Sequence, residues 1–305
     1  MNTSSFTFLE ASHWTDYALL DSGDGLNLER FGRYIFVRPE SQAMWKRSLD
    51  AEWKQAHAVF QPTGEESGGH WDFKKKVEER WEMRYVLDPS IIEKGALKFW
   101  VMTTPGRHLG VFPEVAAHWD WFSHLIQHEV HKSHEVNVLN LFGYTGLASL
   151  AAAAAGARVT HVDASKKSVN WARENQALSN LTEKPIRWIV DDALKFVQRE
   201  ARREVKYDGI ILDPPKFGRG PKGEVWEVYK SLPNLFEACR ACLSEHPLFV
   251  VTTLYAVRAS AIHVAQGMED MMNGFRGKIE MGELVAREQS AGRLLSQAVY
   301  ARWER

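Results

Sequence analysis

A strand-like run that ends in a turn of small residues constrains the fold of this chain more than any other feature. Residues 136–141 are mostly apolar and lead directly into Phe142-Gly-Tyr-Thr-Gly146. A second apolar run closes on Asp163, 20 residues after Gly143. A strand, a turn, a helix and then a carboxylate at the end of the next strand place backbone donors and a ribose acceptor around one ligand. The pattern therefore predicts a nucleotide-like ligand at the carboxyl edge of a parallel sheet.

The turn disfavours a pyrophosphate. The dinucleotide fingerprint needs three glycines as G-x-G-x-x-G, whereas this turn has only Gly143 and Gly146. Phe142 and Thr145 stand where small residues would otherwise lie against the pyrophosphate. A dinucleotide oxidoreductase would also leave unexplained the segment Asp213-Pro-Pro that follows the apolar run 207–212.

Four segments in this order and spacing resemble the class I S-adenosylmethionine-dependent methyltransferases. The resemblance is closest to the bacterial branch that includes large-subunit ribosomal RNA methyltransferases, whose members carry a Leu-Phe-x-Tyr-Thr-Gly turn and an Asp-Pro-Pro-Lys-Phe segment. It extends from residue 110 to the C-terminus, and Gly110-Val-Phe-Pro-Glu114 resembles the lid that covers the cofactor in this family. The four segments are Asn140–Gly146, His161–Asp163, Asp191–Ala193 and Asp213–Phe217.

The resemblance implies S-adenosylmethionine as the cofactor and assigns residues to it. Asp163, followed by Ala164, would accept hydrogen bonds from the ribose hydroxyls. Asp192 would accept from the adenine amine while Ala193 donates an amide, with neighbouring Asp191 as the alternative acceptor. Asp163 could also cap the helix that follows it, which is compatible with ribose binding, and capping is the alternative role of Asp192. The turn would lie against the methionine part and Phe112 over the adenosine, so the remaining expected cofactor residues are Phe112, Asn140, Phe142, Gly143, Tyr144, Thr145 and Gly146.

The segment Asp213-Pro214-Pro215-Lys216-Phe217 is predicted to be catalytic. Prolines fix φ and remove backbone donors, which leaves carbonyls and one carboxylate to receive N–H bonds from a nitrogen acceptor. In related nitrogen methyltransferases an aromatic residue directly follows the prolines and stacks on the base. Here Lys216 occupies that place, so stacking by Phe217 and phosphate binding by Lys216 both stay open beside a merely rigid loop.

The cysteines argue against one alternative chemistry. Some family members methylate carbon 5 of cytosine through a thiolate after the fifth strand, where this chain has Thr252-Thr-Leu254. Cys239 and Cys242 come earlier, inside a stretch predicted to be helical. A nucleobase nitrogen is therefore the predicted acceptor. A protein or small-molecule substrate is the alternative, and a non-catalytic cofactor-binding regulator is a third reading.

Charge and composition bound the partners. The 305 residues carry a formal net charge of −1 and neither half is basic, so an RNA partner follows from the resemblance and not from a phosphate-binding charge. No run of 18 apolar residues and no signal-peptide pattern is present, which predicts a soluble cytoplasmic protein without a membrane partner. His124, His128 and His131 would share one helix face, but no metal motif accompanies them, and no metal site is predicted.

The hydrophobic pattern predicts two domains. Residues 1–109 read as a β-rich domain for substrate recognition, in which tryptophans fill the core or, alternatively, stack on bases. Residues 110–305 alternate strands and helices, which predicts an α/β fold with a doubly wound, Rossmann-like methyltransferase sheet and a C-terminal antiparallel strand pair. The strands are expected at 136–141, 158–163, 186–190, 207–212, 247–252, 278–287 and 296–303, and the helices at 145–156, 165–179, 192–204 and 225–243.

Overall fold

The computed structural model describes residues 5–11, 13–63, 68–87 and 96–305. Its centre is an eight-stranded sheet in the order β1-β16-β17-β15-β12-β9-β10-β11. Strands β9 to β12 and β15 run parallel, whereas β17 runs antiparallel to both β15 and β16. The expected doubly wound sheet and terminal antiparallel pair are both confirmed. The bounds are β1 Ser5–Glu10, β9 Asn137–Leu141, β10 Arg158–Asp163, β11 Ile186–Val190, β12 Gly209–Leu212, β15 Phe249–Leu254, β16 Lys278–Arg287 and β17 Leu294–Glu304.

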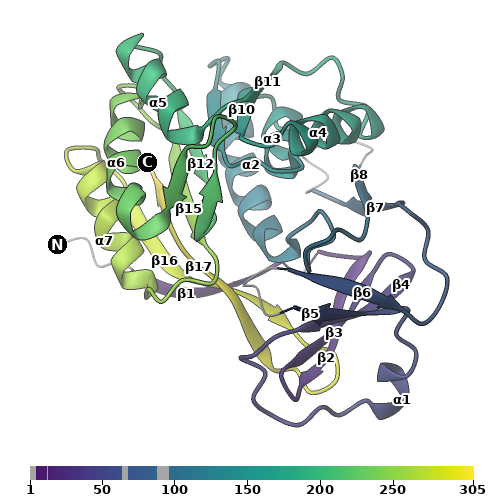
Figure 1. Cartoon of the computed structure of the whole chain (residues 1–305). Coiled ribbons are helices and arrows are strands. Elements are labelled where there is room, and N and C mark those ends of the chain that lie inside the picture. The colour runs from purple at the N-terminus through teal and green to yellow at the C-terminus, as the bar shows by residue number, and fades with distance from the viewer. Residues whose placement is uncertain (1–4, 12, 64–67, 88–95) are drawn as a thin grey trace.

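Helices cover both faces of this sheet (Figure 1). On one face α2 packs against α3 and α3 against α4, and on the other α5 packs against α6 and α6 against α7. A run of buried alanines in α3 lets that helix approach the sheet closely. The bounds are α2 Ala116–His131, α3 Leu147–Ala154, α4 Lys166–Leu178, α5 Ala193–Arg202, α6 Val228–Ala241 and α7 Ala261–Met272.

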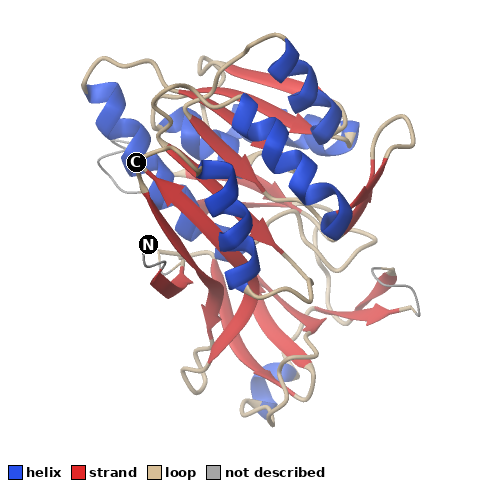
Figure 2. Ribbon diagram, turned by 90° about the vertical axis from the view of Figure 1, so that its left-hand side faces the viewer, coloured by secondary structure: helices blue, strands red, loops and turns tan. Residues whose placement is uncertain are grey.

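The N-terminal region forms a second, five-stranded sheet, which lies below the first in Figure 2. Its buried tryptophans, such as Trp53 and Trp81, lie in apolar clusters, which agrees with the core-packing interpretation. Strand β1 instead pairs with β16 of the large sheet, so it crosses the division expected at residue 110. The bounds are β2 Tyr17–Gly23, β3 Leu26–Phe31, β4 Tyr34–Pro39, α1 Asp50–Trp53, β5 Ala58–Pro62 and β6 Gly69–Phe73, with a separate pair β7 Trp81–Tyr85 and β8 Leu97–Val101.

Helix α7 and two local features were not predicted. The helix expected at 225–243 begins only at Val228, because β14 (Val225–Glu227) pairs with β13 (Phe217–Arg219) in a short hairpin. A 3-10 turn, η1 (Pro113–Val115), leads into α2. Within the described residues, every helix is too short or too polar to cross a membrane.

Strand order reverses between β9 and β12, which are neighbours in the sheet. In such sheets a ligand binds beyond the carboxyl ends of the strands at this point. The turn after β9, Asp163 after β10 and Asp213 after β12 therefore converge on one edge of the sheet.

Candidate active site

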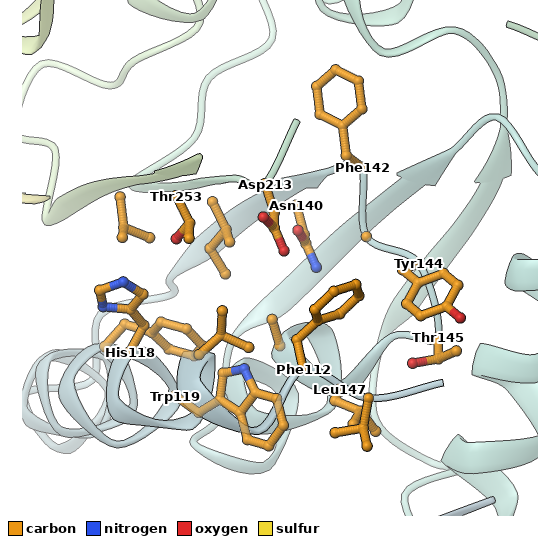
Figure 3. Close-up of a pocket in the computed structure, with 17 residues that line it drawn as sticks. Phe112, His118, Trp119, Asn140, Phe142, Tyr144, Thr145, Leu147, Asp213 and Thr253 are labelled. Atoms are coloured by element: carbon orange, nitrogen blue, oxygen red, sulfur yellow. The ribbon is translucent and has the colours of Figure 1, made fainter. Parts of the chain in front are cut away.

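A cavity opens at this edge (Figure 3). Asp213 and Asn140 face it from the sheet, while Phe112 and Trp119 face it from the opposite side (Figure 3). The lid-like segment, α2, the turn after β9, β12 and β15 all contribute to its wall. The lining residues are Val111, Phe112, Val115, His118, Trp119, Phe122, Asn140, Phe142, Gly143, Tyr144, Thr145, Leu147, Ala148, Ile211, Asp213, Val251 and Thr253.

Hydrogen bonds from neighbouring elements hold the turn after β9 in place. The amide of Gly143 donates to Val162 O at 3.0 Å, and Asn175 Nδ2 donates to Thr145 O at 2.9 Å. The Thr145 hydroxyl donates to Gly110 O at 2.7 Å, which ties the turn to the lid-like segment. The turn is therefore fixed by the tertiary structure before any ligand binds.

Asn140 and Phe142 serve this turn in different ways. Asn140 Nδ2 donates to the Ser149 hydroxyl at 2.9 Å inside the core, so its side chain anchors α3 to β9. Phe142 borders the cavity, but its ring points away from the other lining side chains (Figure 3) and packs on Trp226, with 4.9 Å between centroids. Asn140 thus shapes the pocket wall, and Phe142 connects the turn to the β13–β14 hairpin.

Packing by itself requires a glycine at both positions of this turn. A Cβ at Gly143 would lie 2.4 Å from the His161 ring, and one at Gly146 would lie 2.7 Å from the Cβ of Ala172 on α4. Gly146 also has φ +85°, which L side chains rarely adopt. Sequence reasoning expects a side chain at Gly146 to block the cofactor without unfolding the chain, but the space that it would enter is already filled by α4.

Asp163 links the turn to the next helix. One carboxylate oxygen accepts from the Tyr144 amide at 2.9 Å and the other from the Ser165 amide at 2.8 Å. Burial raises the pKa of this carboxyl, and the two amide bonds act in the opposite direction. Each oxygen can accept a further hydrogen bond, so the half-buried group suits a pair of hydroxyl donors. Ala164 beside it is also half-buried.

The two aspartates after β11 differ in what they already bind. Asp191 accepts from the Asp192 amide through one oxygen and pairs with Arg199 through the other, at 2.6 Å. Asp192 caps α5 through Oδ1, which accepts from the Lys195 amide at 2.9 Å. Asp191 is thus already paired with a cation that competes with an amine donor, so Asp192, next to buried Ala193, is the better candidate for the adenine amine.

Asp213 is the member of its motif that lines the cavity. Its Oδ1 is shielded from solvent and has no hydrogen-bond partner among the described residues. Burial, reinforced by the charge of Glu114, raises the pKa of this carboxyl to about 8. A buried acceptor without a partner at a cavity wall is costly unless a ligand supplies the donor.

The rest of the motif turns away from the cavity. Pro214 is buried and Pro215 exposed, and the Pro215 carbonyl accepts from the Trp226 indole at 2.7 Å. Lys216 and Phe217 lead into the β13–β14 hairpin, where the Phe217 ring is 52% exposed. The structure therefore brings Asp213 together with the turn after β9, and it places Lys216 and Phe217 on the adjoining surface.

Several site residues were missed by sequence reasoning. His118, Trp119 and Phe122 reach the cavity from α2, which carries no motif. Burial lowers the pKa of His118 well below its usual range, so this imidazole is neutral. No role was predicted for Glu114 beyond its place in the lid-like segment. A lone acid within the apolar run Val-Phe-Pro-Glu-Val-Ala-Ala was nevertheless a usable signal of a buried carboxyl.

Part of the chain is similar to known proteins. A family model described as "Conserved hypothetical protein 95" matches residues 119–227. Curated relatives named ribosomal RNA large subunit methyltransferase K/L match at 37% identity over 86 residues in Pseudoalteromonas atlantica and at 41% over 73 residues in Shewanella frigidimarina. These matches cover 28% and 24% of this chain but only 12% and 10% of the relatives' length.

Solved structures give a match over the whole chain. The crystal structure of the S-adenosylmethionine-dependent methyltransferase from Agrobacterium tumefaciens is 44% identical, with a TM-score of 0.88 over 100% of this chain and 97% of that one. A Streptococcus mutans structure at 17% identity, with a TM-score of 0.69 over 96% of this chain and 76% of that one, agrees in fold alone. The fold, the site and the full-length match together define the class, and the chain belongs to the S-adenosylmethionine-dependent methyltransferases.

One prediction tests the ribose assignment. Replacing Asp163 with Ala is expected to weaken S-adenosylmethionine binding by about 1.5–3 kcal/mol for each charged hydrogen bond lost. Isothermal titration calorimetry measures the change. Asp208→Ala is the matched control, because Asp208 also accepts a backbone amide, from Asn137 at 2.9 Å, but stands before β12 at the opposite end of the strand. An Asp163 variant that binds as tightly as the control would contradict the assignment.

Proposed function

We propose that this protein transfers the methyl group of S-adenosylmethionine to a nucleobase nitrogen of RNA, with ribosomal RNA as the substrate class. The observation that carries the proposal is the Asp213 carboxyl, held at the cavity wall by two prolines with one oxygen unpartnered. The cofactor supplies an electrophilic methyl group on a sulfonium. The task left to the protein is to align the acceptor and accept its N–H, and alignment alone can lower the barrier by about 7–11 kcal/mol.

The residues present fit this cofactor. Asp163 offers acceptors for two hydroxyls, Asp192 offers one for an amine, and the apolar wall of Val111, Phe112 and Leu147 suits the methylene groups of the methionine chain. Asp213 presents an unpartnered acceptor within the same cavity. We assign cofactor binding to the expected residues on this basis.

RNA as the substrate is supported by the names of the curated relatives and by the surface beside the site. The β13–β14 hairpin and the start of α6 expose Phe217, Val225 and Tyr229 beside the cations Arg219 and Lys222. Aromatic faces with nearby cations are the usual platform for unpaired bases and their phosphates. We propose that this surface holds the nucleotides around the methylated base, that residues 1–109 add to substrate recognition, and that the protein works in the cytoplasm.

The structure offers no support for methylation of cytosine carbon 5. Cys239 and Cys242 are fully buried in α6 and its packing, and burial raises the pKa of both thiols. The residues that reach the cavity from β15 are Val251 and Thr253, and neither is a nucleophilic thiol. A protein or small-molecule acceptor is the second candidate. Transfer of tritium from labelled cofactor into ribosomal RNA, followed by mass spectrometry of the nucleosides, distinguishes an RNA acceptor from these. Such transfer would also exclude a non-catalytic regulator.

A second prediction tests the hairpin. Phe217→Ala is expected to weaken binding of single-stranded RNA by about 1–3 kcal/mol, because one stacking face is lost, while cofactor affinity stays unchanged. Fluorescence anisotropy with a labelled ribosomal RNA fragment measures the first quantity and calorimetry the second. Leu294→Ala is the control, since Leu294 is an exposed apolar residue on β17, outside both the hairpin and residues 1–109. Equal RNA affinity in the two variants would exclude stacking by Phe217.

A further inference from the structure

Glu114 lies in the 3-10 turn that carries the lid-like segment against the fold. The turn is fixed from the N-terminal region, where the Trp14 indole donates to Pro113 O at 2.8 Å. The Glu114 side chain is only 8% exposed. It borders a second cavity, on the side of the turn where β1, β2 and β16 meet, together with Tyr17 and Arg287. Glu114 thus stands between this cavity and the active site.

Arg38 is the cation that acts on Glu114, and it already forms an ion pair with another carboxylate. Arg38 donates to both carboxylate oxygens of Glu29, each at 2.7 Å, and Tyr17 donates to the same carboxylate at 3.0 Å. Arg38 attracts Glu114 as well, but Glu29 repels it. At the edge of the second cavity, Arg287 is likewise paired, with Glu10 at 3.0 Å. Glu114 therefore lies among charges that nearly cancel.

Asp213 is a second carboxyl near Glu114. Phe112 and Val115, on either side of Glu114 in this turn, line the active-site cavity together with Asp213, whose Oδ1 has no hydrogen-bond partner among the described residues. Glu114 is the charged residue that acts on Asp213. The ring of Tyr255 lies 5.0 Å from that of Phe112, and burial, followed by the charges of Glu114 and Asp213, raises the pKa of its phenol. Burial raises the pKa of Glu114 to about 7, and burial with Glu114 raises that of Asp213 to about 8. Two neighbouring buried carboxyls without a cation of their own titrate as one pair.

We propose that Asp213 and Glu114 share a proton in the free enzyme and release it to solvent when a cationic cofactor occupies the pocket. The proposal rests on the proposed function, since it needs S-adenosylmethionine at this site. Glu114 is a positioning residue in this scheme, because it acts through Asp213. The consequence is an order of events. Asp213 becomes a full hydrogen-bond acceptor for the substrate N–H only after the methyl donor is bound.

Calorimetry in two buffers tests the proposal without any substrate. Titrations at pH 7.5 in phosphate and in Tris, whose ionisation enthalpies differ, give the number of protons released per ligand bound. We expect wild type to release about half a proton or more with S-adenosylmethionine beyond the release of Glu114→Gln and of Asp213→Asn. S-adenosylhomocysteine has a neutral sulfur, so the excess of wild type over the variants should vanish with it. The ligand amino group also titrates, but it contributes equally in wild type and variants.

The affinity itself gives a second readout. A linked proton changes affinity by up to about tenfold per pH unit, and release on binding means that affinity for the cationic ligand rises with pH. Between pH 6 and 9 this rise should be steeper in wild type than in Glu114→Gln. Glu10→Gln is the control, because Glu10 borders the same second cavity but is paired with Arg287.

The possible outcomes separate the proposals. Equal proton release in wild type and Glu114→Gln would overturn the shared proton and leave the cofactor assignment intact. Absence of cofactor binding to wild type would instead overturn the proposed function. If Glu114→Gln does not fold by circular dichroism, Asp213→Asn decides alone, since it removes the other member of the pair.

Discussion

Replacing Asp213 with Ala is expected to lower the rate of methyl transfer by roughly 10²–10⁴, the usual contribution of a positioned acid–base group. Asp213 presents its unpartnered Oδ1 at the cavity wall, and the prolines after it restrict the backbone that holds it. Loss of the carboxyl leaves the substrate N–H without its acceptor. Single-turnover transfer to ribosomal RNA at saturating cofactor measures the effect, and cofactor affinity should change much less.

The cysteines supply the control for this experiment. Cys239→Ala and Cys242→Ala remove thiols that are buried away from the cavity, so transfer should stay close to the wild-type rate. An Asp213 variant with the wild-type rate would show that the motif is only a rigid loop. Loss of transfer in a folded cysteine variant would restore covalent catalysis as an explanation.

Gly146→Val is expected to destabilise the protein by about 2–5 kcal/mol, the sum of about 1–2 for a side chain at positive φ and about 1–3 for overpacking. The new Cβ would lie 2.7 Å from that of Ala172 on α4, and the branched side chain cannot move away from a helix packed on the sheet. The shift of the urea unfolding midpoint, converted with the measured slope, gives the loss.

Gly223→Val separates the two causes. Gly223 has φ +86°, almost the same as Gly146, but a Cβ there would meet nothing within 4 Å. Its substitution should therefore cost only the conformational part, about 1–2 kcal/mol. Equal losses at the two glycines would mean that contact with α4 adds nothing to the cost at Gly146, so packing would not explain this glycine.

The large sheet was predictable because its signals are local. Each of the five parallel strands is a short apolar run that ends at a turn or a carboxylate, and the structure begins and ends them within two residues of the expected ranges. The antiparallel pair at the C-terminus also followed from its pattern. The hairpin β13–β14 was missed, because Val225–Glu227 becomes a strand only by pairing with Phe217–Arg219 and by the bond from Trp226 to Pro215.

For the site, the sequence by itself determined which residues stand at the strand ends. Asp163 and Asp213 follow apolar runs, and the carboxyl ends of parallel strands meet at one edge. The reason for the glycines could not be read in this way, since α4 approaches Gly146 through a contact between residues that are distant in sequence. Only the tertiary structure decided that Lys216 and Phe217 leave the cavity and that His118 and Trp119 enter it.

The ionisation of the carboxyl and phenol groups at the site was likewise decided by the tertiary structure alone. Glu114, Asp213 and Tyr255 are far apart along the chain, and nothing in their local sequence shows that they meet. Their pKa values depend on burial and on the charges nearby, which are properties of the folded core. The sequence determines which reactive side chains stand at the strand ends and turns, because side-chain periodicity and turn formation are local. Proton sharing is decided by distances through space, and those exist only once the chain has folded.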